Sequence, residues 1–148
     1  MDDDIPPLLP LHEVPPLRTQ ADLHRQWRAM MGPLGFAGRR LWLLFLEPDD
    51  RPTELLLQID DVAEDPREGE AESLLRLCCE VRREHDLGRV AVLLSRPGEG
   101  TVRGGDRRWG RALLEAARQS GVPLAPLHLA TDDAVLPLTG DDLLAPVG

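Results

Sequence analysis

The side chains that could do chemistry are concentrated in one stretch of the chain, residues 89–121. The stretch has the pattern of a buried strand, a glycine-rich loop and an amphipathic helix. In open α/β sheets, ligands usually bind where a loop leaves the carboxyl end of a strand. We therefore expect any ligand site of this protein to lie on the loop of 96–105.

Arginines gather on this loop and on the first turns of the helix that follows, although the chain carries a formal net charge of −9. Free N–H groups at a helix start and nearby guanidinium groups could hold a phosphate or a carboxylate. The arginines could equally form a solvated face, paired with local acidic side chains. Basic residues in a first turn oppose the helix dipole, which favours a compensating anion or an acidic partner. The candidate ligand-binding residues are Arg96, Gly98, Arg103, Asp106, Arg107 and Arg111, with Arg108 beside them.

Catalytic patterns are weak. Ser95 at the strand end and His128 on a later strand could serve as nucleophile and base, with Asp132 or Asp133 orienting the histidine. Nothing around Ser95 matches the Gly-x-Ser-x-Gly elbow, and a histidine in a half-buried strand is more often structural. The four histidines do not fall at metal-ligand spacing. We predict no catalytic residue, metal or cofactor.

Composition excludes several classes of partner. The acidic balance argues against nucleic acid and against an anionic membrane surface. No apolar run approaches ~20 residues and no signal-peptide pattern is present. The two cysteines, Cys78 and Cys79, are neighbours in a helical pattern; they would be redox-active only if exposed and with a lowered pKa. We expect a cytoplasmic protein, and its bias toward Arg, Ala, Pro and Gly is typical of a GC-rich bacterial genome.

The hydrophobic pattern predicts one α/β domain at 18–140, between a flexible, acidic, Pro-rich tail at 1–17 and a second tail at 141–148. In the first tail, Leu8, Leu9 and Leu11 could lie on the domain surface or dock on a partner. Thr19 should cap an N-terminal helix, and Asp106 should cap the helix that ends at Gly121. The expected elements are helices at 20–31, 71–85 and 106–121, and strands at 41–47, 54–60, 89–95, 123–130 and 134–138.

This order predicts a mixed β-sheet: an antiparallel hairpin, then a β-α-β unit, with helices packed on the sheet and an extra N-terminal helix. Three local patterns accompany it. Leu94-Ser95-Arg96-Pro97-Gly98 ends a strand, Arg103-Gly104-Gly105-Asp106 opens a helix, and Gly121-Val122-Pro123-Leu124 leads into the strand with His128.

With these patterns, 41–138 resembles the RadC-like branch of the JAB/MPN (JAMM) metalloprotease domains, within the wider cytidine-deaminase-like architecture. In that family the first pattern is His-x-His-Pro-Ser-Gly and the second is Ser-x-x-Asp. The resemblance implies a zinc ion held by two histidines and the aspartate, with one position left for the activated water. Leu94 and Arg96 stand at the histidine positions and cannot bind zinc, so only Asp106 remains.

The resemblance therefore implies a degenerate relative without the family's peptidase activity. We expect a non-catalytic, metal-free interaction or scaffold module that uses the loop from Arg96 to Arg111 to recognise a protein partner. The alternative is a small-anion sensor or a hydrolase-type enzyme that uses the same loop with His128. A third reading is a homo-oligomer joined through Leu- and Trp-rich surface at the sheet edge.

Overall fold

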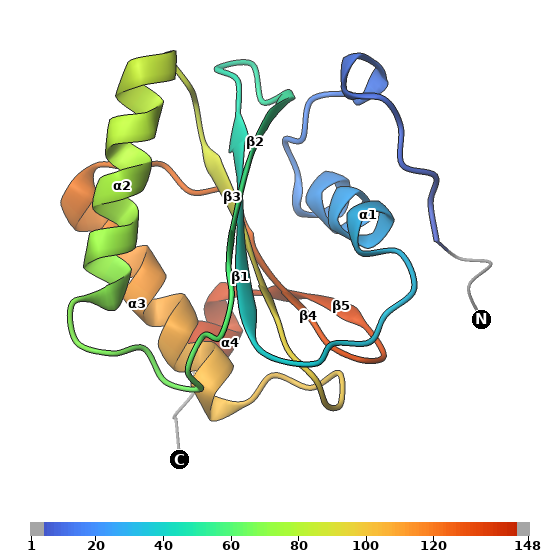
Figure 1. Ribbon diagram of the computed structural model, residues 1–148, viewed down its shortest axis with the longest axis vertical. Helices are drawn as coiled ribbons and strands as arrows, with labels where there is room; N and C mark the ends of the chain where they lie inside the picture. The colour runs from blue at the N-terminus through green and yellow to red at the C-terminus, as the bar shows by residue number, and fades with distance from the viewer. Residues whose placement is uncertain (1–4, 145–148) are drawn as a thin grey trace.

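A mixed sheet of five strands runs through the middle of the molecule (Figure 1). The computed structural model describes residues 5–144; the parts of the predicted tails at 1–4 and 145–148 lie outside the described residues. The strands are β1 (Arg40–Leu46), β2 (Pro52–Ile59), β3 (Val90–Ser95), β4 (Leu127–Ala130) and β5 (Val135–Leu138). Their order across the sheet is β2-β1-β3-β4-β5. Only β3 and β4 pair in parallel; the other neighbours are antiparallel.

Helices cover both faces of this sheet. Helices α2 (Glu70–His85) and α3 (Gly104–Ser120) lie on one face, and α1 (Gln20–Met31) lies on the other (Figure 1). The short α4 (Gly140–Leu144) follows β5, and a 3-10 turn, η2 (Leu11–Glu13), precedes α1. The result is the predicted α/β arrangement of a hairpin followed by β-α-β. No helix among the described residues is long and apolar enough to span a bilayer.

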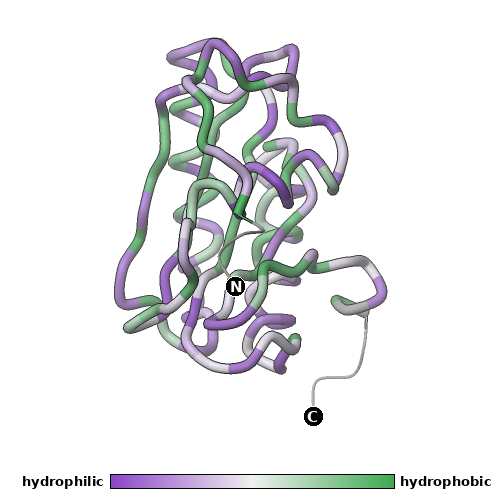
Figure 2. The backbone as a smooth tube through the Cα atoms, turned by 90° about the vertical axis from the view of Figure 1, so that its right-hand side faces the viewer, coloured by the Kyte–Doolittle hydropathy of each residue, from purple (hydrophilic) through white to green (hydrophobic). Residues whose placement is uncertain are grey.

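The two faces form two separate hydrophobic cores. Alternate residues of β1 divide between them: Leu43 packs toward α2 and α3, whereas Leu44 packs toward α1. All six residues of β3 are buried, as a continuous apolar run predicts for a strand covered on both faces. In Figure 2 apolar stretches alternate with hydrophilic ones, which occur at the turns and along the helices.

Helix α1 begins as the sequence predicts. The hydroxyl of Thr19 accepts a hydrogen bond from the N–H of Asp22, and the Asp22 carboxylate accepts one from the N–H of Thr19. These bonds to backbone N–H groups hold the pKa of Asp22 below its usual value. The helix buries Leu23 and Trp27 completely against the sheet. The predicted N-cap of this helix is therefore confirmed.

The Pro-rich segment before α1 differs from the expected packing. Leu8, Leu9 and Leu11 remain exposed, whereas Val14 and Leu17 are buried in the α1-side core. The N–H of Leu17 also donates to a carbonyl of the β1–β2 turn at 2.7 Å. The apolar residues nearest the domain, which can reach the sheet, are therefore the ones that pack.

Two element boundaries toward the C-terminus also differ from the expected ones. Strand β4 begins at Leu127 rather than at 123, because Pro123 and Pro126 have no N–H to donate; Leu124 forms only an isolated bridge with Val90. At the other end, the expected tail after residue 140 starts with α4, whose Leu143 is buried against α3.

Candidate functional site: the loop after β3

The β3–α3 connection lies at the carboxyl end of a buried parallel strand, where the sequence predicts a site. Strand β3 ends at Ser95 and helix α3 begins at Gly104, so residues 96–103 form the loop. Helix α3 is held close by Gly105: a Cβ atom there would lie 2.6 Å from the carbonyl oxygen of Glu64. Its Trp109 is buried and donates from Nε1 to the carbonyl of Ala63 at 2.9 Å. The segment before α2 therefore fixes the start of α3.

A buried ion pair joins the two ends of the loop. The side chains of Arg96 and Asp106 are 1% and 0% exposed. Arg96 Nε donates to Asp106 Oδ1 at 2.9 Å, and Arg96 Nη2 donates to Asp106 Oδ2 at 2.8 Å. This two-point geometry is the strong form of an arginine–carboxylate contact.

The remaining donors of Arg96 bind the loop itself. Its Nη1 donates to the carbonyl of Pro97 at 3.0 Å and to that of Glu99 at 3.4 Å, and Nη2 also donates to the carbonyl of Thr101 at 2.7 Å. An arginine side chain has five N–H donors, and all five are thus engaged inside the protein. Arg96, expected on a recognition surface, is instead the buried centre around which the loop folds.

Asp106 occupies a different helical position from the one predicted. The N-cap of α3 is Arg103, three residues before the predicted N-cap, so Asp106 is the third residue of the helix. The Asp106 carboxylate accepts the backbone N–H of Arg103 at 2.8 Å, and it therefore still satisfies an orphan donor of the helix start. Arg96 draws this carboxylate inward, which explains why an apparent cap residue is fully buried.

A second carboxylate, Asp132 on the β4–β5 turn, ties three loops together. It accepts the N–H of Gly98 at 2.8 Å and the N–H of Phe36 at 2.9 Å. These two hydrogen bonds hold the pKa of Asp132 below its usual value. Gly98 has a φ of +104°, which suits glycine. Sequence reasoning considered Asp132 as a partner of His128; the structure places it on the loop after β3 instead.

The other arginines of the loop and helix have separate surroundings. Arg108 pairs with Asp65, and Arg111 donates to the carbonyl of Leu143. The Arg103 guanidinium lies over Gly98, where a Cβ atom would be 3.1 Å from Arg103 Nη2 and 3.2 Å from Arg96 Nη1. Within residues 5–144, no acidic side chain pairs with Arg103 or Arg107, and the Nε of Arg107 is buried with no hydrogen-bond partner. Arg103 is exposed and Arg107 is half-buried, so both leave positive charge without an acidic partner at the start of α3.

Ser95 and His128 do not form a nucleophile–base pair. Ser95 Oγ accepts the indole N–H of Trp42 at 2.9 Å and lies 3.5 Å from the carbonyl of Arg40. His128 Nδ1 contacts the carbonyl of Pro126 at 3.2 Å, and its Nε2 is buried without a partner. Burial, and secondarily the nearby His24, lowers the pKa of His128 to about 4. The ring of His24 lies 6.3 Å away and contacts β5 through the carbonyl of Val135. His128 is thus a neutral residue between α1 and the sheet.

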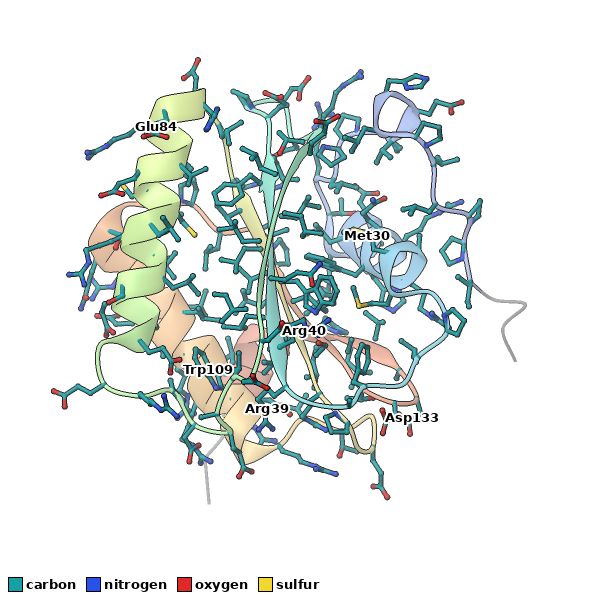
Figure 3. The ribbon with its side chains drawn as sticks, in the orientation of Figure 1. Met30, Arg39, Arg40, Glu84, Trp109 and Asp133 are labelled. Atoms are coloured by element: carbon teal, nitrogen blue, oxygen red, sulfur yellow. The ribbon has the colours of Figure 1, made fainter. Side chains whose placement is uncertain are left out.

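A cleft of about 350 Å³ opens beside Ser95, on the side of β1 and β2. Its charged lining consists of Arg39, Arg40, Asp60 and Asp61. Figure 3 shows Arg39 and Arg40 at this end of the sheet, with Asp133 on the neighbouring turn. Arg40 pairs with Asp60 and lies 5.3 Å from the centre of the Trp42 ring. The sequence analysis missed this cleft, although two arginines and two aspartates at paired strand ends were a usable signal.

The residues at the metal position of the resemblance do not fit a zinc ion. Leu94 is buried in the core on the α2 and α3 side, and Arg96 neutralises the one carboxylate that remains. Within the part of the chain that the structure describes, no group of three or more His, Cys, Asp or Glu residues could hold a metal. Cys78 and Cys79 are both free thiols, and burial raises the pKa of Cys78 to about 11. Cys78 is accordingly a core residue.

No family model matches the chain, and no curated protein matches it.

Replacing Arg96 with Met should unfold the protein far more readily than a matched change at an exposed pair. Removal of one partner leaves Asp106 buried and uncompensated, which costs about 3–5 kcal/mol. Arg108→Met breaks the solvent-exposed pair with Asp65 and should cost less than about 1 kcal/mol. Urea denaturation followed by tryptophan fluorescence measures both; equal losses would contradict the central role of Arg96.

Acid should destabilise the protein through His128. Its pKa is about 4 in the folded protein and about 6.5 when unfolded, so the unfolded chain binds the extra proton between these values. The contribution of His128 to the free energy of unfolding is therefore complete above about pH 6.5 and is lost progressively as the pH drops toward 4. Between about pH 7 and pH 5, wild type should lose about 2 kcal/mol more than His128→Gln, as measured by urea denaturation. Parallel pH profiles of the two proteins would contradict this assignment.

Proposed function

We propose that this chain is a non-catalytic, metal-free relative of the RadC-like JAB/MPN domains, and that it acts as a protein-interaction module. Two features support the relationship. The hairpin of β1 and β2 followed by β3, α3 and β4 is the order that the resemblance implies. The loop after β3 carries an Arg-Pro-Gly sequence where the family carries His-Pro-Ser, and Asp106 lies at the start of the next helix.

The observation that carries the proposal is the buried ion pair by which Arg96 engages both carboxylate oxygens of Asp106. One carboxylate oxygen accepts Arg96 Nε; the other accepts Arg96 Nη2 and the N–H of Arg103. A metal ion on this carboxylate would have to displace a guanidinium that is itself buried. The displaced cation would then lack its partner, at the cost of several kcal/mol expected for an unpaired buried charge. The chain therefore has the Arg96 guanidinium at the position where the family has its catalytic zinc ion.

The partner should carry negative charge. Arg103 and Arg107 lie at the loop and the first turn of α3 with no acidic partner among residues 5–144. Their charge also opposes the positive end of the α3 dipole, so an external anion would stabilise the helix start. We call these two residues the Arg103–Arg107 surface. An acidic protein segment fits it, and the acidic remainder of this chain would repel such a segment elsewhere. The two free, adjacent cysteines agree with a reducing, cytoplasmic setting.

A short Glu-rich peptide is the probe that tests this surface. Titrated into the labelled protein, it should shift the backbone amide resonances of residues 98–108, and added salt should weaken the effect because the contact is electrostatic. The double variant Arg103→Glu, Arg107→Glu should abolish these shifts.

Arg118→Glu is the matched control. Arg118 is exposed at the far end of the same helix, where it pairs with Glu115, so its reversal should leave peptide binding unchanged. Equal loss in both variants would show that only overall charge matters, and shifts confined to another face would assign recognition elsewhere. Either result would overturn the proposed surface.

A further inference from the structure

We propose that the free edge of β2 pairs antiparallel with the same edge of a second copy of this chain, joining two five-stranded sheets into one. The two edges of the sheet differ in how they are protected against pairing with another strand, and this difference is independent of the proposed function.

The β5 edge is protected against pairing. Strand β5 has only four residues, and Pro137 in it has no N–H to offer. The Nε2 atom of His24, in α1, lies 2.8 Å from the carbonyl oxygen of Val135 in β5, so a side chain already covers part of this edge. Short length, proline and a covering side chain are the devices by which proteins block edge-to-edge association.

The β2 edge has none of these protections along its middle. The strand has eight residues, and its only proline is the first, Pro52. Its pairing with β1 is irregular between Pro52 and Leu56 and is regular from Leu56 to Ile59. Leu55, Leu56 and Leu57 follow one another and are each only partly buried. Figure 1 looks toward this edge: β2 crosses in front of β1, with α2 to one side and α1 to the other. A long apolar edge without a charge directed at its centre is a template for another strand.

The register identifies which backbone groups point outward from β2. The N–H of Leu46 in β1 donates to the carbonyl of Arg89, which precedes β3, so Leu46 directs its backbone groups toward β3. Because these groups alternate along a strand, Leu43 directs its groups toward β2, and its partner there is Leu57. Leu57 therefore bonds inward, and the N–H and C=O groups of Leu56 and Gln58 face outward.

A two-fold axis through Leu56 makes this edge complementary to itself. Leu56 would lie opposite Leu56 of the second copy, and each Leu55 opposite a Leu57. Each exposed Glu54 would lie opposite the exposed Gln58, whose amide N–H can donate to the carboxylate. Moving the axis by one residue, to Leu57, would instead oppose Glu54 and Asp60, two like charges. The side chains therefore favour the axis at Leu56 over the axis at Leu57, and the self-complementary pairs make a copy of the same strand the occupant.

Sedimentation equilibrium of the full chain over a wide concentration range tests the pairing, with variants at exposed Gln58 as probes. Gln58→Arg places a cation opposite Glu54 twice in the dimer and should tighten it by about threefold to tenfold. Gln58→Glu places like charges there and should weaken it by a similar factor. Because Gln58 is exposed, neither change should impair folding. A wild-type chain that stays monomeric at every concentration, or two variants that dissociate alike, would overturn the proposal.

Matched lysines at the two edges locate the interface. Leu56→Lys brings two cations together at the two-fold axis and should give a folded monomer. Leu136→Lys makes the same change at a partly buried leucine of β5 and should leave the dimer intact. Circular dichroism shows whether each variant is folded. Dissociation by Leu136→Lys but not by Leu56→Lys would move the contact to the other edge and refute the β2 pairing.

Discussion

The buried ion pair between Arg96 and Asp106 is the interaction on which the carboxyl end of the sheet depends. A lone buried charge is costly, and each of these side chains compensates the other with nearly ideal geometry. Arg96 also donates hydrogen bonds to three carbonyl oxygens of the loop, and the Asp106 carboxylate accepts the backbone N–H of the N-cap residue, Arg103. The path of residues 96–103 and the start of α3 are therefore set from inside the protein.

Asp132 does for the neighbouring loops what Asp106 does for this one. By accepting N–H groups from Phe36 and Gly98, it connects the segment before β1, the loop after β3 and the β4–β5 turn. Strand ends that would otherwise leave unsatisfied backbone groups are thereby closed against one another. Among the described arginines of the loop and of the first turn of α3, Arg103 and Arg107 are the two for which no acidic partner is found.

The sequence predicted the elements well because their signals are local. The reciprocal bonds of Thr19 and Asp22 and the apolar run of β3 depend on near neighbours, and both helix and strand appear where expected. The Arg96–Asp106 pair could not be predicted in the same way. Its residues are ten apart, and an arginine beside a glycine-rich loop normally indicates solvent or a bound anion. Only the fold shows that the guanidinium turns inward.

We propose a degenerate RadC-like domain, and this proposal depends on whether the Asp106 carboxylate binds a metal ion. Zinc analysis of the purified, metal-exposed protein by native mass spectrometry tests that point most directly. We expect no tightly held zinc, because Arg96 already satisfies the carboxylate of Asp106. One zinc ion per chain, lost when Asp106 is changed to Asn, would contradict it.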